Sequence, residues 1–172
     1  MSDPPGVVEF CRSMRPRLVG TLTLLCGDAQ VAEELAQETL ARLWVNWSKL
    51  HRSTAERADA WAYRVAINLA NSWWRRLAAE RRARARLAMF TPADPPGPDL
   101  AEASAIRQAV AALPRRQRTA LVLRYYADLP IGEVATLMGC APGTVKSLTN
   151  RAISALRAGY EQPSIHEVGN DA

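Results

Sequence analysis

The sequence predicts an all-α fold made of two small helical domains joined by a proline-rich linker. In both halves Ala, Leu, Arg and Glu predominate, and apolar side chains recur at spacings of three and four. Runs of alternating β-branched residues, which would indicate strands, are almost absent. Between the halves, residues 91–99 hold four prolines and two acidic residues, a composition that neither a helix nor a central strand tolerates.

The chain length limits the number of domains and excludes a large multidomain enzyme. Its 172 residues allow one ordinary domain or two small ones. We expect a first domain over residues 1–90, a linker over 91–103, a second domain over 104–160 and a flexible tail over 161–172. The longest apolar run is much shorter than the ~20 residues of a membrane helix, and the N-terminus lacks the pattern of a signal peptide. We therefore expect no membrane insertion and a cytoplasmic location.

The positive charge of the chain favours a nucleic-acid partner. The net charge is +5, and every cation except Lys49 and Lys146 is an arginine, the residue best suited to bind phosphate and stack on bases. A GC-rich genome is the alternative explanation of this arginine excess. Residues 64–86 carry seven arginines and one glutamate, so the positive charge is concentrated in one segment.

The three cysteines, Cys11, Cys26 and Cys140, are odd in number and far apart. This spacing argues against a disulfide framework and a zinc site, and it favours buried free thiols in a reducing compartment. No metal ion or other cofactor is expected.

Residues 28–47 have the pattern of a helix capped by Asp28, with an unusual outer face. The core side is expected to hold Ala32, Leu35, Ala36, Leu40, Leu43 and Trp47. The outer side combines acidic and apolar residues: Glu34, Gln37, Glu38, Ala41, Trp44 and Val45. Either another protein docks on this mixed face or an N-terminal helix of the same chain covers it, and periodicity alone does not decide between the two.

Residues 47–59 are polar and poorly periodic, which predicts a long functional loop. His51 in this segment lacks an accompanying nucleophile or carboxylate, so we interpret it as an exposed loop residue. Residues 59–76 then form a helix with two distinct faces. Its polar face holds Trp61, Arg64, Asn68, Asn71, Ser72 and Arg75, and its core face holds Tyr63, Ala66, Ile67, Ala70, Trp73 and Trp74. The Arg and Asn side chains suit DNA contacts, and Trp61 is a better candidate for base stacking than the two core-facing tryptophans.

The second half predicts a helix-turn-helix. We expect one helix within residues 111–126 with Pro114 in its first turn, a short helix ended by Gly139, and a third helix from Thr144. On the third helix Val145, Leu148, Thr149, Ala152 and Leu156 face inward, and Lys146, Ser147, Asn150, Arg151 and Ser154 face outward. The outward set suits a DNA major groove, although a purely structural three-helix unit is the alternative. Leu148 lies between the two faces, so it is either a core residue or an outward one.

Five motifs in this order resemble the extracytoplasmic-function (ECF) group of bacterial sigma factors. They are residues 28–38, 61–68, 112–118, 123–126 and 143–147. The resemblance extends from about residue 7 to residue 158, and residues 73–76 and 146–152 look closest to the SigE-like actinobacterial subgroup.

The resemblance implies a sigma region 2 domain and a sigma region 4 domain, which bind core RNA polymerase and read the −10 and −35 promoter elements. The polar face described above would contact −10 DNA, and the segment from about residue 48 to 60 would hold a flipped base. Glu34, Gln37, Glu38, Ala41 and Trp44 would contact the β′ clamp helices, and residues 121–129 would help bind the β flap. Gly143, Thr144, Lys146, Ser147, Asn150 and Arg151 would contact −35 DNA.

The same resemblance implies no catalytic residue, because polymerase performs the chemistry, and an anti-sigma factor partner in many members. The chain departs from the family at Leu148, where many members carry arginine, and at Thr149, where they carry an apolar residue. The main alternative is a stand-alone helix-turn-helix transcriptional regulator whose first half senses a signal or dimerises. A small nucleic-acid enzyme would need clustered carboxylates, an activated nucleophile or metal ligands, and the spacing offers none.

Overall fold

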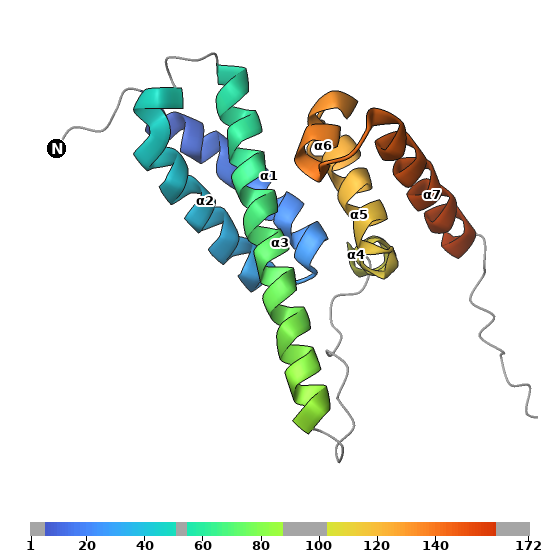
Figure 1. The fold of residues 1–172 in the computed structure, drawn as a ribbon. Coiled ribbons are helices and arrows are strands. Elements are labelled where there is room, and N and C mark those ends of the chain that lie inside the picture. Colours follow the sequence, from blue (N-terminus) through green and yellow to red (C-terminus); the bar gives the residue numbers. More distant parts are fainter. Residues whose placement is uncertain (1–5, 51–54, 88–102, 161–172) are drawn as a thin grey trace, which may run out of the picture.

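The computed structural model describes residues 6–50, 55–87 and 103–160 (Figure 1). Its elements are α1 Val7–Cys26, α2 Ala29–Leu50, α3 Ala55–Leu87, α4 Ala103–Ala112, α5 Arg115–Leu121, the π-helix η1 Val122–Tyr126, α6 Ile131–Met138 and α7 Pro142–Tyr160. These ranges contain no strand, so the predicted all-α fold is confirmed. The expected linker and tail lie largely outside the described residues.

Helices α1, α2 and α3 pack together into the first group of helices (Figure 1). Gly27 ends α1 in the left-handed region at φ 76°, and the carboxylate of Asp28 accepts the amide N–H groups of Gln30 and Val31 at 2.9 and 3.0 Å. The predicted N-cap at Asp28 is therefore confirmed. The side chains expected on the core side of α2 are buried, except Leu40, which is half-buried.

Helix α3 is longer at both ends than the sequence analysis predicts. The prediction of a loop over residues 47–59 is wrong at both ends, because α2 continues to Leu50 and α3 already begins at Ala55. Residues 55–58 read Ala-Glu-Arg-Ala, and these are strong helix formers. His51 lies outside the described residues. At its other end α3 continues past Arg76 to Leu87 and projects beyond the helices packed around it (Figure 1).

The second group of helices contains the predicted helix-turn-helix. Gly139 ends α6 at φ 59°, a conformation that glycine adopts without strain, and α7 follows from Pro142, two residues before the expected start. Pro114 is the N-cap of α5, with φ −53° and ψ 137°, and does not occupy the first turn, which corrects its predicted position. Helix α5 continues directly into η1, whose wider turns the sequence pattern does not indicate.

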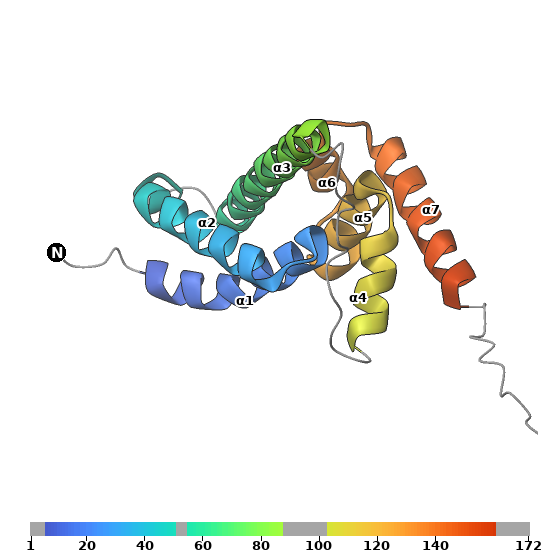
Figure 2. The same cartoon turned by 90° about the horizontal axis from the view of Figure 1, so that it is seen from below.

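The two groups of helices are in contact, and one buried arginine links them. Figure 2 shows the C-terminal end of α1 lying against the second group. The guanidinium of Arg118 donates to the backbone carbonyls of Leu25 at 3.0 Å and Leu113 at 3.2 Å, and also to that of Ala111. It therefore satisfies carbonyl groups at the ends of two helices, one in each group.

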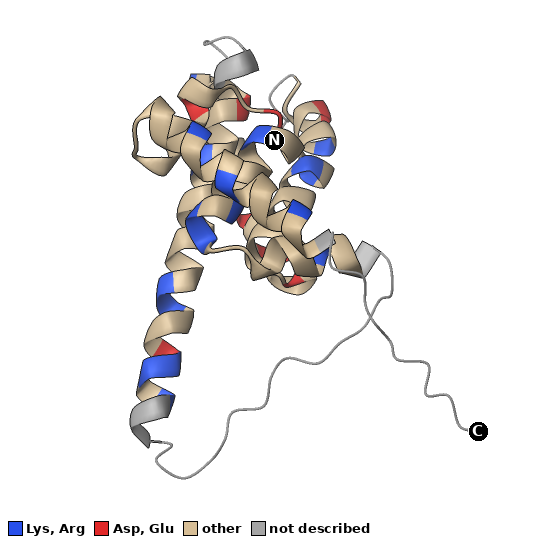
Figure 3. Ribbon diagram, turned by 90° about the vertical axis from the view of Figure 1, so that its right-hand side faces the viewer, with Lys and Arg blue, Asp and Glu red and all other residues tan. Residues whose placement is uncertain are grey.

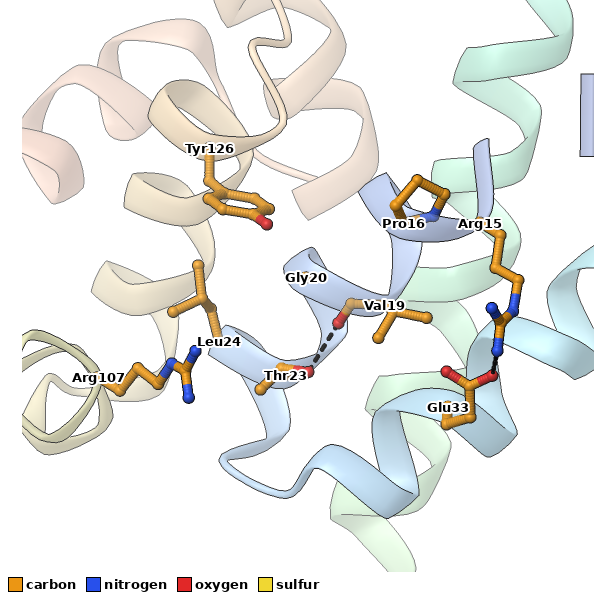
Figure 4. Close-up of a pocket in the computed structure, with 9 residues that line it drawn as sticks. All are labelled: Arg15, Pro16, Val19, Gly20, Thr23, Leu24, Glu33, Arg107 and Tyr126. Carbon is orange, nitrogen blue, oxygen red and sulfur yellow. Dashed lines mark hydrogen bonds and ion pairs between the residues drawn. The ribbon is translucent and has the colours of Figure 1, made fainter. Parts of the chain in front are cut away.

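A second link joins η1 to α1. Tyr126 extends toward α1 beside Gly20, in a groove that Arg15 and Arg107 also line (Figure 4). A β-carbon at Gly20 would lie 2.6 Å from Cζ of Tyr126, which is closer than real contacts allow. Glycine at this position therefore permits the close approach of the tyrosine ring.

The cysteines are free, but only Cys26 is buried; Cys11 and Cys140 are half-buried, which corrects the expectation of three buried thiols. Burial is the main cause that raises the pKa of Cys26 to about 12. Within the described ranges, every helix is too short or too polar to cross a membrane.

Candidate nucleic-acid and protein interfaces

The polar face predicted on α3 is present and largely accessible. Arg64, Asn68 and Arg75 are exposed, and Ser72 is half-buried and accepts a hydrogen bond from Arg75 at 2.9 Å. Residues Asn68, Ser72, Arg75 and Arg76 line one open groove together with Arg42 from α2. This groove presents three guanidinium groups and one amide, which are donors suited to phosphate and base edges.

The tryptophans of α3 occupy intermediate positions. Trp61 is half-buried and packs against the hydrophobic core, so it is less accessible than the predicted stacking role requires. Trp73 also packs against the core, as predicted. Trp74 lies where the two groups of helices meet, with the guanidinium carbons of Arg115 and Arg118 each 5.9 Å from its ring centroid. Sequence periodicity assigns Trp74 to the core, but apart from Trp73, whose ring centroid lies 4.7 Å away, its ring partners come from α5.

The second group of helices approaches part of the polar face of α3. Arg115 donates a hydrogen bond to Oδ1 of Asn71, which is half-buried. Arg64 lines a pocket together with Glu133 and Thr136 of α6. In this arrangement Asn71 is already engaged by Arg115, whereas Asn68 and Arg75 face the open groove.

The outer face of α2 is exposed, which answers the question that periodicity left open. Glu34, Gln37, Glu38, Ala41, Trp44 and Val45 are all exposed. The exposed fractions are 38% for Trp44 and 80% for Val45, so neither α1 nor another described helix covers these apolar side chains. Glu38 forms an ion pair with Arg42 at 2.7 Å. An acidic surface with an exposed indole suits a protein partner that offers cations around an apolar contact.

Helix α7 separates an inward face from an outward face as predicted. Gly143, Thr144, Lys146, Ser147, Asn150 and Arg151 are exposed. Val145 and Ala152 are buried, and Thr149 is buried with its hydroxyl donating to the carbonyl of Val145 at 2.7 Å. Leu148 is half-buried against the core, so the structure places it among the packing residues. The hydroxyl of Thr149 is satisfied within its own helix, which allows a polar residue at this buried position.

Sequence reasoning missed Arg118 and Gly20, which join the two groups of helices. Within 121–129, the segment predicted to bind a protein, Tyr125 and Tyr126 are 65% and 52% exposed, and Leu123 is buried. The described residues hold no cluster of three or more metal-ligating side chains. The chain thus presents three polar or mixed surfaces, on α2, α3 and α7.

Known proteins match this chain in both halves. Residues 10–80 match the family model described as Sigma-70 region 2, and residues 103–156 match the one described as Sigma-70, region 4. The RNA polymerase sigma-E factor of Streptomyces coelicolor is 30% identical over 149 residues, which cover 87% of this chain and 82% of that protein. The ECF RNA polymerase sigma factor SigL of Mycobacterium tuberculosis is 34% identical over 143 residues, which cover 77% of this chain and 76% of that protein.

A solved structure has the same fold. The sigma factor RpoE from Bartonella quintana, in complex with the anti-sigma factor NepR, superposes with a TM-score of 0.64 at 22% identity, covering 87% of this chain and 95% of that one. The two family models, the relatives and the arrangement of helices agree with one another. The chain therefore belongs to the ECF group of the sigma-70 family of RNA polymerase sigma factors.

Proposed function

We propose that this chain binds core RNA polymerase and directs it to promoters through separate −10 and −35 contacts. Residues 1–90 would form the domain that binds polymerase and the −10 element, and residues 104–160 the domain that binds the −35 element, joined by the linker at 91–103. One observation carries the proposal. The same chain exposes a polar face on α3, a polar face on α7 and a face on α2 that combines acidic and apolar side chains. As a sigma factor it is a transcription initiation factor and not an enzyme.

The −10 contacts in this proposal come from α3. Arg64, Asn68 and Arg75 are exposed on the side opposite the buried Tyr63 and Ala66, so they reach DNA without disturbing the core. Trp61, Asn71 and Ser72 complete the set at half-buried positions. The segment proposed to hold a flipped base now comprises the end of α2, the start of α3 and residues outside the described ranges.

The −35 contacts would come from the exposed side of α7. Lys146 and Arg151 supply charge for phosphates, and Ser147 and Asn150 supply hydrogen-bonding groups for base edges. Gly143 and Thr144 lie in the first turn, where the N–H of Thr144 donates to the carbonyl of Ala141 at 2.9 Å and the N–H of Gly143 suits a phosphate oxygen. The turn ended by Gly139 sets the angle between α6 and α7 that a helix-turn-helix needs.

The protein contacts would come from α2 and from the segment at 121–129. Glu34, Gln37, Glu38, Ala41 and Trp44 would meet the β′ clamp helices of polymerase, and the exposed Tyr125 would help meet the β flap. We place the chain in the cytoplasm, where core polymerase acts. RpoE is seen with a bound anti-sigma factor, and an anti-sigma factor is a candidate partner of this chain as well.

Run-off transcription with purified core polymerase tests the proposal. We expect transcripts that start at one promoter only when both chain and core polymerase are present. Glu38→Arg should weaken core binding in a pull-down, and the control Glu9→Arg, a charge reversal at an exposed site on α1, should leave it intact. Promoter-specific binding by a free dimer of the chain, with no dependence on polymerase, would instead support a stand-alone regulator.

A further inference from the structure

The C-terminal part of α3 has no evident role in packing. The family model for region 2 ends at residue 80, but the helix continues to Leu87. Figure 3 shows this end of α3 projecting from the other helices with Lys and Arg positions along it. Every described side chain from Ala78 to Arg84 is exposed. We call Arg81, Arg82 and Arg84 the arginine extension.

The charges of the arginine extension are largely unbalanced within the described part of the chain. Glu80 is the single acidic residue among residues 75–87, and its carboxylate oxygen lies 4.0 Å from a guanidinium nitrogen of Arg84. No described carboxylate pairs with Arg81 or Arg82. Like charges three and four residues apart destabilise a helix, and a free-standing helix of a few turns is marginal in water. Neither burial nor ion pairing therefore accounts for this concentration of arginine.

The extension continues the promoter face of α3 along the same side of the helix. At about 100° per residue, Asn68, Arg75 and Arg82 all lie within roughly 40° of Arg64 around the helix axis. All four side chains are exposed. The distance from residue 64 to residue 82 along the axis is about 27 Å at ~1.5 Å per residue. One stripe of DNA-compatible side chains thus passes from the region 2 model into the extension.

The residue types of the extension favour duplex backbone over single-stranded DNA. Residues 75–87 contain no aromatic side chain on which an unpaired base could stack, and no Asn or Gln to read a base edge. Arginine binds phosphate oxygens bidentately and stays charged at any physiological pH. A row of guanidinium groups on a projecting helix therefore fits the regular line of phosphates along a double helix.

We propose that the arginine extension binds the phosphate backbone of double-stranded promoter DNA on the −35 side of the −10 element. This rests on the proposed function, in which α3 contacts the −10 element. In chain order the extension comes between the −10 face of α3 and the domain that would bind the −35 element, so the proposal assigns it to the duplex on the −35 side of the −10 contacts. The contact adds affinity without adding sequence preference, because phosphates are the same at every base pair.

The test compares two variants that each remove two positive charges. Arg81→Gln with Arg82→Gln removes two phosphate contacts, and the control Arg12→Gln with Arg107→Gln removes two exposed charges far from the extension. Glutamine keeps the helix propensity, and circular dichroism checks that helical content is unchanged. Binding of each holoenzyme to promoter DNA is measured over a range of salt concentrations.

The negative slope of log affinity against log salt should be shallower than that of the wild type by about 1.8 for the extension variant. The control variant should keep the wild-type slope. The difference should persist when the spacer sequence is changed and disappear on a probe that lacks duplex DNA upstream of the −10 element. Equal slopes for the two variants, or weaker binding to core polymerase in place of weaker DNA binding, would overturn the proposal. Because wild-type holoenzyme must first initiate at a specific promoter, failure of the proposed function is recognised separately.

Discussion

Replacing Arg118 with methionine tests how strongly one buried guanidinium holds the two groups of helices together. Arg118 is 9% exposed and donates to the carbonyls of Leu25, Ala111 and Leu113. Methionine has a similar length and fills most of the volume, so Arg118→Met removes the hydrogen bonds without opening a large cavity. The carbonyl of Leu25 then loses a donor that lies 93 residues away in the sequence.

The expected loss follows from the strength of these bonds and the cost of burying the cation. Hydrogen bonds to a charged group contribute about 1.5–3 kcal/mol each to the free energy of unfolding. Burial lowers the pKa of the Arg118 guanidinium, which shows that the charged form pays a desolvation cost that methionine avoids. Since three bonds share one guanidinium and the desolvation cost is recovered, we expect a net loss of about 2–3 kcal/mol.

Urea unfolding followed by circular dichroism measures this loss. The matched control is Arg116→Met, the same substitution at an exposed position two residues away, which should change the free energy of unfolding by less than ~0.5 kcal/mol. Small-angle X-ray scattering should also show a larger radius of gyration for Arg118→Met, because the bond to Leu25 crosses between the groups. Equal stabilities for the two variants would refute the assigned role of Arg118.

Three further predictions concern other positions. Gly20→Val should enlarge the radius of gyration, because its β-carbon would collide with Tyr126; an unchanged radius would mean that the ring rotates aside at little cost. The pKa of Cys26 is raised to about 12 from 9.0, so the thiolate is about a thousandfold rarer than in an exposed cysteine. Iodoacetamide at pH 8 should therefore alkylate Cys26 far more slowly in the native protein than in urea. Equal alkylation rates in a peptide mass assay would contradict the burial of this thiol. Leu148→Arg should lower the melting temperature, because the side chain packs against the core; an unchanged melting temperature with a salt slope steeper by ~0.9 would place it on the DNA side.

The features that the sequence predicted well are set by neighbours within one or two turns. The buried and exposed faces of α2 and α7 follow from helical periodicity, and the N-cap at Asp28 and the end of α6 at Gly139 follow from local backbone chemistry. These signals do not depend on what the rest of the chain does. The helix-turn-helix could therefore be delimited to within two residues.

The features that the sequence failed to predict depend on distant partners or on weak end signals. The sequence analysis places the start of α3 too late, because Glu56, Arg57 and Asp59 continue the polar run of residues 51–54, although Ala55 and Ala58 favour a helix. The role of Arg118 depends on a carbonyl in α1, and the environment of Trp74 depends on two arginines from α5. No pattern of three or four residues carries that information.

The contact between the two groups of helices bears directly on how α3 is used. Oδ1 of Asn71 accepts a hydrogen bond from Arg115, so the same oxygen is not available to DNA in this arrangement. When only a fraction of the molecules is in the state that can bind DNA, the apparent affinity for DNA is reduced to that fraction of the intrinsic affinity. Weakening the contact at Arg118 or Gly20 should therefore act in two opposite directions, lowering the free energy of unfolding and raising the access of DNA to Asn71. A variant that loses stability but gains no DNA binding on α3 would show that the packing of the two groups and the −10 face are independent.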